Sequence, residues 1–307
     1  MEGGAIVIKK IKVILIILCF FVFAISLNFI LQKYIQDAQN KIAYNNLIKL
    51  AIKSTKENNV NQFNNAESNI KDEHTNNINN EVNSIEEISI PNVLSINNTQ
   101  NLSYKNEKIG YNSTNAIENN KNNSKINWNE LFSINKDIIG WIEIPNTNIN
   151  YPILLDENSF YINHNFQKKV NHNGSIFIRS GDILENNEIN IYGHNMKNGT
   201  MFAKLANYIN KDFFEKNSKI YVYTKNHTYE GNIFSAYSKG IEEENKAIQS
   251  LNFNEKINYY KSQSVNLGET KENINKIVKL VTCSYLNAKT SPTDQRYYVI
   301  AEISEIY

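Results

Sequence analysis

Cysteine, proline and arginine are all scarce in this sequence of 307 residues. There are four prolines, two cysteines and only two arginines, Arg179 and Arg296, although lysine and arginine together number 32. Cys19 lies within a long apolar run, so Cys283 is alone in the polar part of the chain, and a disulfide there is excluded. A lone thiol of this kind is either buried or reactive. Because lysine has replaced arginine almost everywhere, we expect a surviving arginine to do what lysine cannot, such as bidentate binding of an anion.

The usual motifs for metals and nucleotides are also missing. No C-x-x-C or H-E-x-x-H pattern occurs among the five histidines and two cysteines, and no phosphate-binding glycine loop is present. The net charge of +1 provides no global field that would attract nucleic acid. We therefore expect no metal, no organic cofactor and no nucleic-acid partner.

The first long segment is apolar enough to cross a membrane. Val13 to Leu31 reads VILIILCFFVFAISLNFIL, and a helix of about nineteen residues spans roughly 30 Å, the thickness of a bilayer core. Lysines precede the run and no A-x-A-like site follows it, which favours an uncleaved anchor over a signal peptide. We predict a cytoplasmic N-terminus over residues 1–12, a single transmembrane anchor over 13–31, and an extracellular remainder.

The next segment, residues 32–125, is rich in asparagine, serine, glutamate and lysine. A short helix over about 35–53 is expected to continue from the membrane. Beyond it the sequence has too few apolar residues to offset the entropy of ordering, so we predict a flexible, asparagine-rich stalk.

Residues 126–307 have the character of one mainly β domain with a few helices. Strand-like segments alternate with turn residues, and about eight strands favour a closed or nearly closed barrel. The predicted strands are 138–144, 149–154, 175–178, 188–192, 219–224, 228–237, 277–283 and 296–302. Short helices are expected near 128–132, 201–208 and 211–214, and a longer one over 242–262.

Three residues carry the candidate chemistry. Cys283 ends the apolar run KIVKLVTC, His194 follows the strand-like EINIY, and Arg296 begins RYYVIAEI. Taken alone, each residue can be explained without a catalytic role: Cys283 as a small core residue, His194 as a turn histidine and Arg296 as a solvated charge. Together they fit acyl transfer, because a thiol nucleophile needs a proton partner and the tetrahedral intermediate needs positive charge at its oxyanion.

Longer motifs around these residues carry a resemblance to a known family. DIIGWIEIPNTNINYPIL, NGSIFI, NIYGHNMKNGTMFAKL and VTCSY…DQRYYVIAEI together resemble class B sortases of Gram-positive bacteria. The resemblance covers about residues 137–307. It implies a sortase-type closed β-barrel with an N-terminal helix and an inserted helix before the last strands, which suits the helix expected over 242–262.

The resemblance also implies roles for single residues. Cys283 matches the family nucleophile, His194 the acid/base and Arg296 the oxyanion partner. The positions expected to bind the substrate peptide are Asn158, Ile162, Thr282, Ser284 and Tyr285. This sequence departs from the family at Val281, where class B members often have serine, and in a slightly longer loop between Cys283 and Arg296.

The activity that the resemblance implies is transpeptidation. A surface protein with an LPxTG- or NPxTx-like C-terminal motif would be cleaved through a Cys283 thioester and joined to an amine of a peptidoglycan precursor or cross-bridge. A papain-like or NlpC-type peptidase is disfavoured, because those enzymes place cysteine before histidine. Two alternatives stay open: a non-catalytic cell-surface binding module and a pilin-polymerising sortase.

Overall fold

The computed structural model describes residues 2–66, 125–179, 186–286 and 293–306. The chain forms two units, one comprising Met1–Val60 with Asn123–Tyr307 and the other Asn61–Asn122. Most of the predicted stalk, residues 67–124, lies outside the described residues.

One helix, α1 (Glu2–Ala66), contains both the apolar run and the short helix expected after it. It therefore continues past residue 32, where the predicted stalk begins. Tyr44, Leu47 and Ala51 are buried against the core of the barrel. Their spacing of three and four residues places them on one face of the helix. Ile42, an apolar residue of the same segment, lies off this face and is exposed.

The sheet closes into a barrel, as predicted. Its order is β5-β1-β2-β3-β4-β8-β9-β6, and β5 also pairs with β6, so eight strands form a ring within the described part of the chain. The bounds are β1 (Ile138–Glu143), β2 (Asn150–Leu155), β3 (Ile176–Ile178), β4 (Glu188–Tyr192), β5 (Lys219–Tyr223), β6 (Thr228–Gly240), β8 (Ile277–Cys283) and β9 (Gln295–Glu305). A two-residue strand that the sequence did not predict, β7 (Asn266–Leu267), pairs with β6 beside the ring.

Strand β8 shows how residue alternation divides the core into two layers. Val278 and Leu280 belong to the main cluster inside the barrel, whereas Ile277 and Val281 belong to a second cluster on the other face. This is the period of two expected of a strand with both faces covered. The face that carries Val281 also carries Cys283, so Cys283 lies on the outer face of the barrel.

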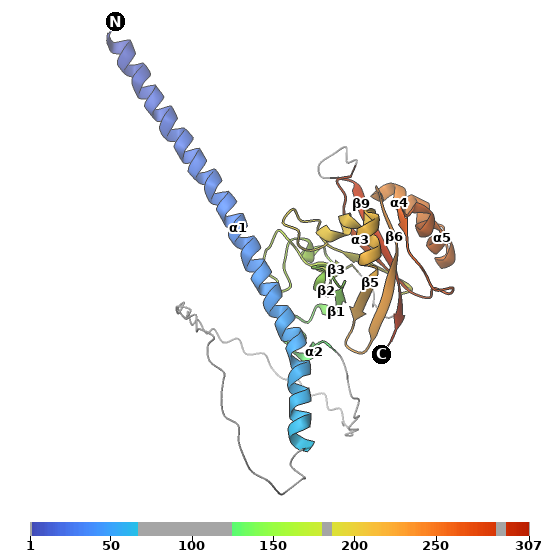
Figure 1. Ribbon diagram of the computed structural model, residues 1–307. Helices are drawn as coiled ribbons and strands as arrows, with labels where there is room; N and C mark the ends of the chain where they lie inside the picture. The colour runs from blue at the N-terminus through green and yellow to red at the C-terminus, as the bar shows by residue number, and fades with distance from the viewer. Residues whose placement is uncertain (1, 67–124, 180–185, 287–292, 307) are drawn as a thin grey trace, which may run out of the picture. The chain divides into compact units, whose positions relative to one another are not determined.

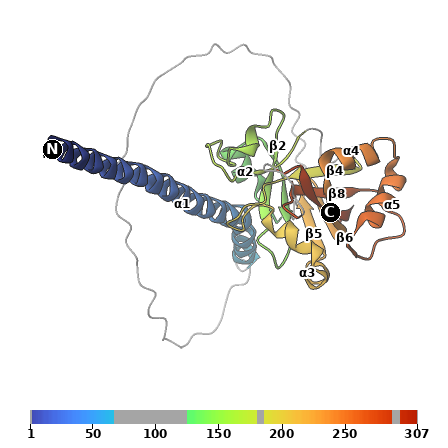
Figure 2. The same ribbon diagram turned by 90° about the horizontal axis from the view of Figure 1, so that it is seen from above.

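The helices other than α1 are short and lie outside the barrel (Figures 1 and 2). They are α2 (Trp128–Ile134), η2 (Phe160–Ile162), η3 (Ala203–Ile209), α3 (Lys211–Lys216), α4 (Ile241–Ile248) and α5 (Phe253–Gln263). The single helix predicted over 242–262 is in fact the pair α4 and α5. Helix α4 ends at Ile248, with Gln249 as its C-cap. Asn252 caps the start of α5, because its side chain accepts from Glu255 N while the Glu255 carboxylate accepts from Asn252 N. Both helices lie beside β6.

Candidate active site

Strand register sets Arg296 directly opposite Cys283. The two are Cα partners in the antiparallel pairing of β8 and β9. Opposite residues of such a pair point to the same face, with Cβ atoms about 5 Å apart. Both side chains are half-buried. Nη1 of Arg296 donates to the carbonyl oxygens of Thr293 at 2.8 Å and Gln295 at 2.9 Å, which fixes the guanidinium at the start of β9.

The parallel pairing of β4 with β8 sets His194 on the other side of Cys283. Tyr192 pairs with Val281, and each strand then advances by two residues, to His194 and to Cys283. Hydrogen bonds keep the strands together past this point. Gly193 N donates to Val281 O at 3.2 Å, and Thr282 Oγ1 donates to Gly193 O at 2.7 Å.

The imidazole of His194 is held by a backbone carbonyl. Its Nε2 lies 2.7 Å from the oxygen of Ile162, the last residue of η2. A carbonyl oxygen only accepts, so Nε2 carries a proton in this arrangement, and Nδ1 is the nitrogen left to exchange one.

Two glycines of the sequence motifs permit this geometry. Gly174 of NGSIFI has φ +58°, and a Cβ there would collide with the same Ile162 carbonyl. A Cβ at Gly193 would collide with the side chain of Ile176 and lie 2.9 Å from Phe202 Cδ2. Gly174 therefore allows the segment before β3 to approach η2, and Gly193 allows the turn of His194 to approach Ile176 and Phe202.

The structure separates the five predicted substrate-binding residues into two groups. Asn158 is exposed in the loop after β2, Ile162 is half-buried beside His194, and Tyr285 is exposed. Thr282 and Ser284, also among the positions expected to bind the substrate, are only 2% and 0% exposed. Both alternate with Cys283 along the chain and point away from its face. The Ser284 hydroxyl accepts from Ser238 Oγ at 2.8 Å.

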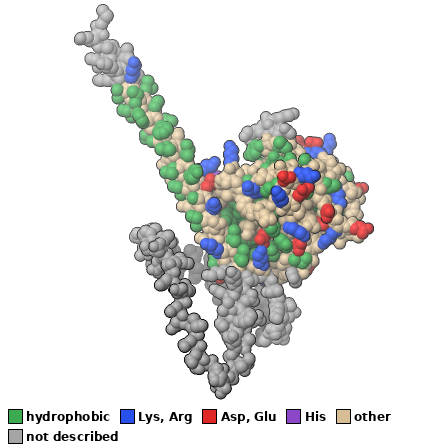
Figure 3. Space-filling view, in the orientation of Figure 1, with side chains coloured by type: hydrophobic (Ala, Val, Ile, Leu, Met, Phe, Trp, Pro, Cys, Tyr) green, Lys and Arg blue, Asp and Glu red, His purple; other side chains and the backbone are tan. Residues whose placement is uncertain are grey.

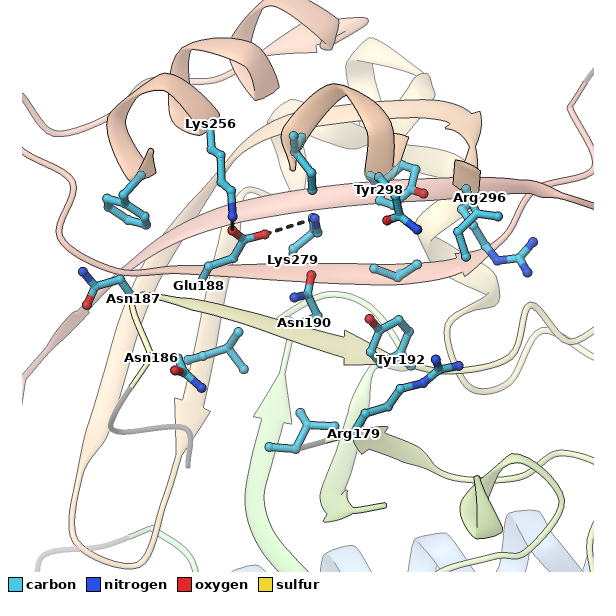
Figure 4. A pocket seen from close by; sticks show the side chains of 17 residues that line it. Arg179, Asn186, Asn187, Glu188, Asn190, Tyr192, Lys256, Lys279, Arg296 and Tyr298 are labelled. Carbon is cyan, nitrogen blue, oxygen red and sulfur yellow. Dashed lines mark hydrogen bonds and ion pairs between the residues drawn. The ribbon is translucent and has the colours of Figure 1, made fainter. Parts of the chain in front are cut away.

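A cavity of about 660 Å³ lies on the outer face of β4, β8 and β9 and reaches Arg296 (Figure 4). Residues of α4 and α5, including Ile241, Ile248 and Lys256, line one side of it. Val281 and Tyr298 lie on its strand face. The cavity therefore begins at the cross-strand partner of Cys283 and extends along the strands away from it.

A charged cluster occupies the far end of this cavity. Glu188 accepts from Lys256 and Lys279, both at 3.0 Å, and from Tyr260 Oη at 2.9 Å. Figure 4 shows the carboxylate between the two lysines. Burial raises the pKa of Glu188, but Lys279, Lys256 and Tyr260 together lower it more, so the net shift is downward. The cluster joins β4, β8 and α5.

Two features of the site were not predicted from the sequence. The first is Asn195, whose Nδ2 donates to Cys283 O at 2.8 Å. Its place next to His194 was the available signal. The Ile162 carbonyl has no sequence signal, because any residue supplies a carbonyl. Among the described residues, no group of three or more His, Cys, Asp or Glu side chains is arranged to hold a metal.

Comparison with known proteins identifies the family. The family model described as a sortase domain matches residues 142–304, more than half of the chain. The chain belongs to the sortase family. Sortase B of Listeria monocytogenes is 35% identical over 162 residues, which are 50% of this chain and 65% of that protein. Sortase B of Staphylococcus aureus is 31% identical over 181 residues, 57% of this chain and 74% of that protein. The chain thus spans slightly less than two thirds of the Listeria sortase.

Solved sortase structures share the fold. The Staphylococcus aureus sortase B–substrate complex has a TM-score of 0.51 and 29% identity, covering 58% of this chain and 85% of that one. A sortase B complexed with Gly3 has a TM-score of 0.51 and 31% identity, covering 59% and 86%. The resemblance to class B sortases and the sortase-type barrel are both confirmed.

Proposed function

We propose that this sortase is a membrane-anchored cysteine transpeptidase in which Cys283 is the nucleophile, His194 the acid/base and Arg296 the oxyanion partner. The observation that supports these roles is the register of β4, β8 and β9, which sets the three residues at neighbouring positions on adjacent strands. From these positions the side chains of His194 and Arg296 need to extend only a short distance to act on a group bound at Cys283. Asn158, Ile162 and Tyr285 are the residues that we propose to contact the substrate peptide.

The first half of the reaction forms a thioester. The Cys283 thiolate attacks the backbone carbonyl carbon of the threonine in an LPxTG- or NPxTx-like motif. The carbonyl oxygen becomes an oxyanion, which the fixed guanidinium of Arg296 stabilises. When the C–N bond breaks, the imidazolium of His194 gives its proton to the departing amine.

The second half transfers the acyl group. An amine of a peptidoglycan precursor or cross-bridge attacks the thioester carbonyl, and neutral His194 accepts a proton from it. The C–S bond then breaks, the thiolate leaves, and an amide joins the surface protein to the acceptor. The solved sortase B complexes with substrate and with Gly3 concern other proteins, but they support a peptide donor and an amine acceptor here.

Helix α1 is the proposed membrane anchor. Within the described residues it is the helix that is long and apolar enough to cross a bilayer, by length and composition. The large apolar side chains from Val13 to Leu31 are exposed along it, and Figure 3 shows them as a hydrophobic surface. Exposure of so much apolar area to water is unfavourable. We propose residues 13–31 as the span, 1–12 as cytoplasmic and the barrel as extracellular.

A pilin-polymerising sortase is the second candidate. A class B sortase of Streptococcus pyogenes, described as involved in pilus biogenesis, has a TM-score of 0.50 and 29% identity, with coverage of 58% of this chain. In that case a lysine side chain of a pilin subunit would replace the peptidoglycan amine. The chemistry at Cys283 would be unchanged, so only the acceptor distinguishes the two functions.

Cleavage of fluorogenic peptides tests the proposal. The full chain in detergent micelles is incubated with LPxTG-like, NPxTx-like and scrambled peptides, with and without oligoglycine or a lysine-containing peptide. We expect motif-dependent cleavage that an amine diverts to a ligated product and that Cys283→Ala abolishes. Cleavage that ignores the motif, or survives the substitution, would contradict it.

A further inference from the structure

Both arginines of the chain line the cavity beside Cys283. Arg296 has a role in the proposed reaction, but Arg179 has none. Arg179 follows β3, and β3 pairs with β4 through Phe177 and Tyr192. Figure 4 shows the guanidinium of Arg179 beside Tyr192, at the same end of the cavity as Arg296.

An aromatic stack holds Arg179 in place. Its guanidinium carbon lies 5.0 Å from the ring centroid of Tyr192, and that ring stacks on Phe177 with centroids 5.7 Å apart. Burial raises the pKa of Tyr192, although the nearby charge of Arg179 lowers it in part. Stacking uses the face of the guanidinium and leaves its N–H edges available. The exposed side chain is therefore oriented, and no hydrogen bond joins its donors to another of the residues that the structure describes.

The positive charges at the two ends of the cavity differ in whether a carboxylate neutralises them. Lys256 and Lys279 share the carboxylate of Glu188. Among the residues that the structure describes, neither arginine forms an ion pair with a carboxylate. The arginine end of the cavity thus has two guanidinium groups whose charge a bound anion would complement.

The distance to the thiol limits where this anion sits on a substrate. Tyr192 is opposite Val281, which is two residues before Cys283 on β8. Two residues of extended chain span about 7 Å, so a group bound over Tyr192 lies within about three residues of the scissile bond.

We propose that Arg179 is a specificity-determining residue that binds a carboxylate of a sortase substrate while the reacting carbonyl lies at Cys283. A carboxylate matches the planar pair of N–H donors that arginine presents and lysine lacks. The inference rests on the proposed transpeptidase function. The carboxylate has two sources: an acidic side chain beside the sorting motif, or a carboxylate close to the acceptor amine.

Paired substrates test this inference and distinguish the sources. In one arm, the full chain in detergent micelles forms the thioester with motif peptides in the absence of an acceptor. The peptides are compared in pairs that carry either Glu or Gln at one position flanking the motif. In the other arm, a peptide without acidic residues is transferred to triglycine or to triglycinamide. We expect the carboxylate form to be preferred about tenfold in kcat/KM in one arm, the effect of a charge-assisted hydrogen bond.

Variants assign the preference to Arg179. Arg179→Gln should use the acidic and neutral partners equally, and Arg179→Lys should keep only part of the preference. Lys246→Gln removes the same charge from an exposed position on α4 that does not line the cavity, and should leave the preference intact. Circular dichroism checks that each variant is folded.

Each outcome decides the matter. Turnover without preference for the carboxylate in either arm, or a preference that survives Arg179→Gln, overturns the inference and leaves the transpeptidase function standing. No turnover of any peptide by the unmodified chain overturns the proposed function and this inference with it.

Discussion

At the scale of single residues, Asn195 joins the histidine turn to the thiol strand. Its amide donates to Cys283 O, and the residue before it in the turn is His194. Asn195→Asp keeps the size but removes the donor and places a negative charge against the carbonyl. We expect kcat to fall about tenfold with little change in KM, because one hydrogen bond of about 1.5 kcal/mol positions the reacting groups. Steady-state kinetics with a motif peptide measure this.

The control for this variant is Asn207→Asp. Asn207 is exposed in η3, so the same chemical change there should leave kcat unaltered. Equal activities of the Asn195 and Asn207 variants would show that the bond to Cys283 O has no positioning role.

Arg296 tests whether charge or shape matters at the proposed oxyanion. Arg296→Lys keeps the positive charge but loses the planar guanidinium, whose Nη1 donates to the Thr293 and Gln295 carbonyls and whose other N–H groups remain for an oxyanion. We expect kcat to fall about 100-fold, as when an oxyanion donor is removed. Single-turnover thioester formation is the appropriate measurement. A lysine variant within threefold of the unmodified chain would rule out the planar guanidinium as the stabilising group.

The sequence predicts the residues of the site better than their surroundings. Strand ends locate His194, Cys283 and Arg296, because each lies where an apolar run meets a polar loop. The inward direction of Thr282 and Ser284 follows from alternation about Cys283, but only once the face of Cys283 is known. The Ile162 carbonyl depends on η2 approaching β4, which local sequence does not encode.

At the scale of elements, part of α1 belongs to the barrel. Leu47 is 1% exposed, whereas Leu50, three residues further along the helix, is 46% exposed. Leu47→Ala should lower the free energy of unfolding by about 3 kcal/mol, the cost of a buried leucine with its cavity. Leu50→Ala should cost far less. Urea unfolding followed by tryptophan fluorescence compares them. Equal effects would mean that α1 does not pack on the barrel.

The Glu188 cluster makes stability depend on pH. The folded pKa of Glu188 is below its unfolded value, so its contribution is present above the unfolded value of about 4.3 and is lost as pH falls through the folded one. Glu188→Gln should lower stability by about 3 kcal/mol at pH 7 because it leaves the largely buried Lys279 unpaired. The deficit should shrink below pH 4.

Thermal unfolding between pH 3 and 7 tests the Glu188 prediction. Glu215→Gln is its control, since that glutamate is 62% exposed and its pairing with Lys211 is long, at 3.8 Å. The control should follow the unmodified chain at every pH. If the unfolding temperature of Glu188→Gln changed with pH in parallel with that of the unmodified chain, the pH dependence would not come from Glu188.

Sequence patterns locate the strands well and the helical insert less well. Alternation and turn residues give β4 and β8 with the bounds that the structure has. The insert between β6 and β8 has a continuous helical composition. Helix α4 nevertheless ends at Ile248, and a capping box at Asn252 starts α5, a break that apolar spacing does not reveal. β7 has two residues, too few for any periodic pattern.

At the scale of the whole molecule, barrel closure separates the hydrophobic core from the reactive surface. The closing pair of β5 and β6 leaves an interior filled by aliphatic and aromatic side chains, while the outer face of β4, β8 and β9 has the cavity that ends at Arg296. Closure is a long-range property that strand patterns suggest but do not specify. The order of strands, which sets His194 and Arg296 on either side of Cys283, needed the structure.

Intact-protein mass spectrometry of the full chain with a sorting-motif peptide, in the absence of amine, tests the central claim most directly. We predict a mass increase equal to the acyl fragment, located on Cys283, removed by hydroxylamine and absent from Cys283→Ala. No adduct with any motif peptide, or an adduct at Cys19 alone, would contradict the assignment of Cys283 as the nucleophile.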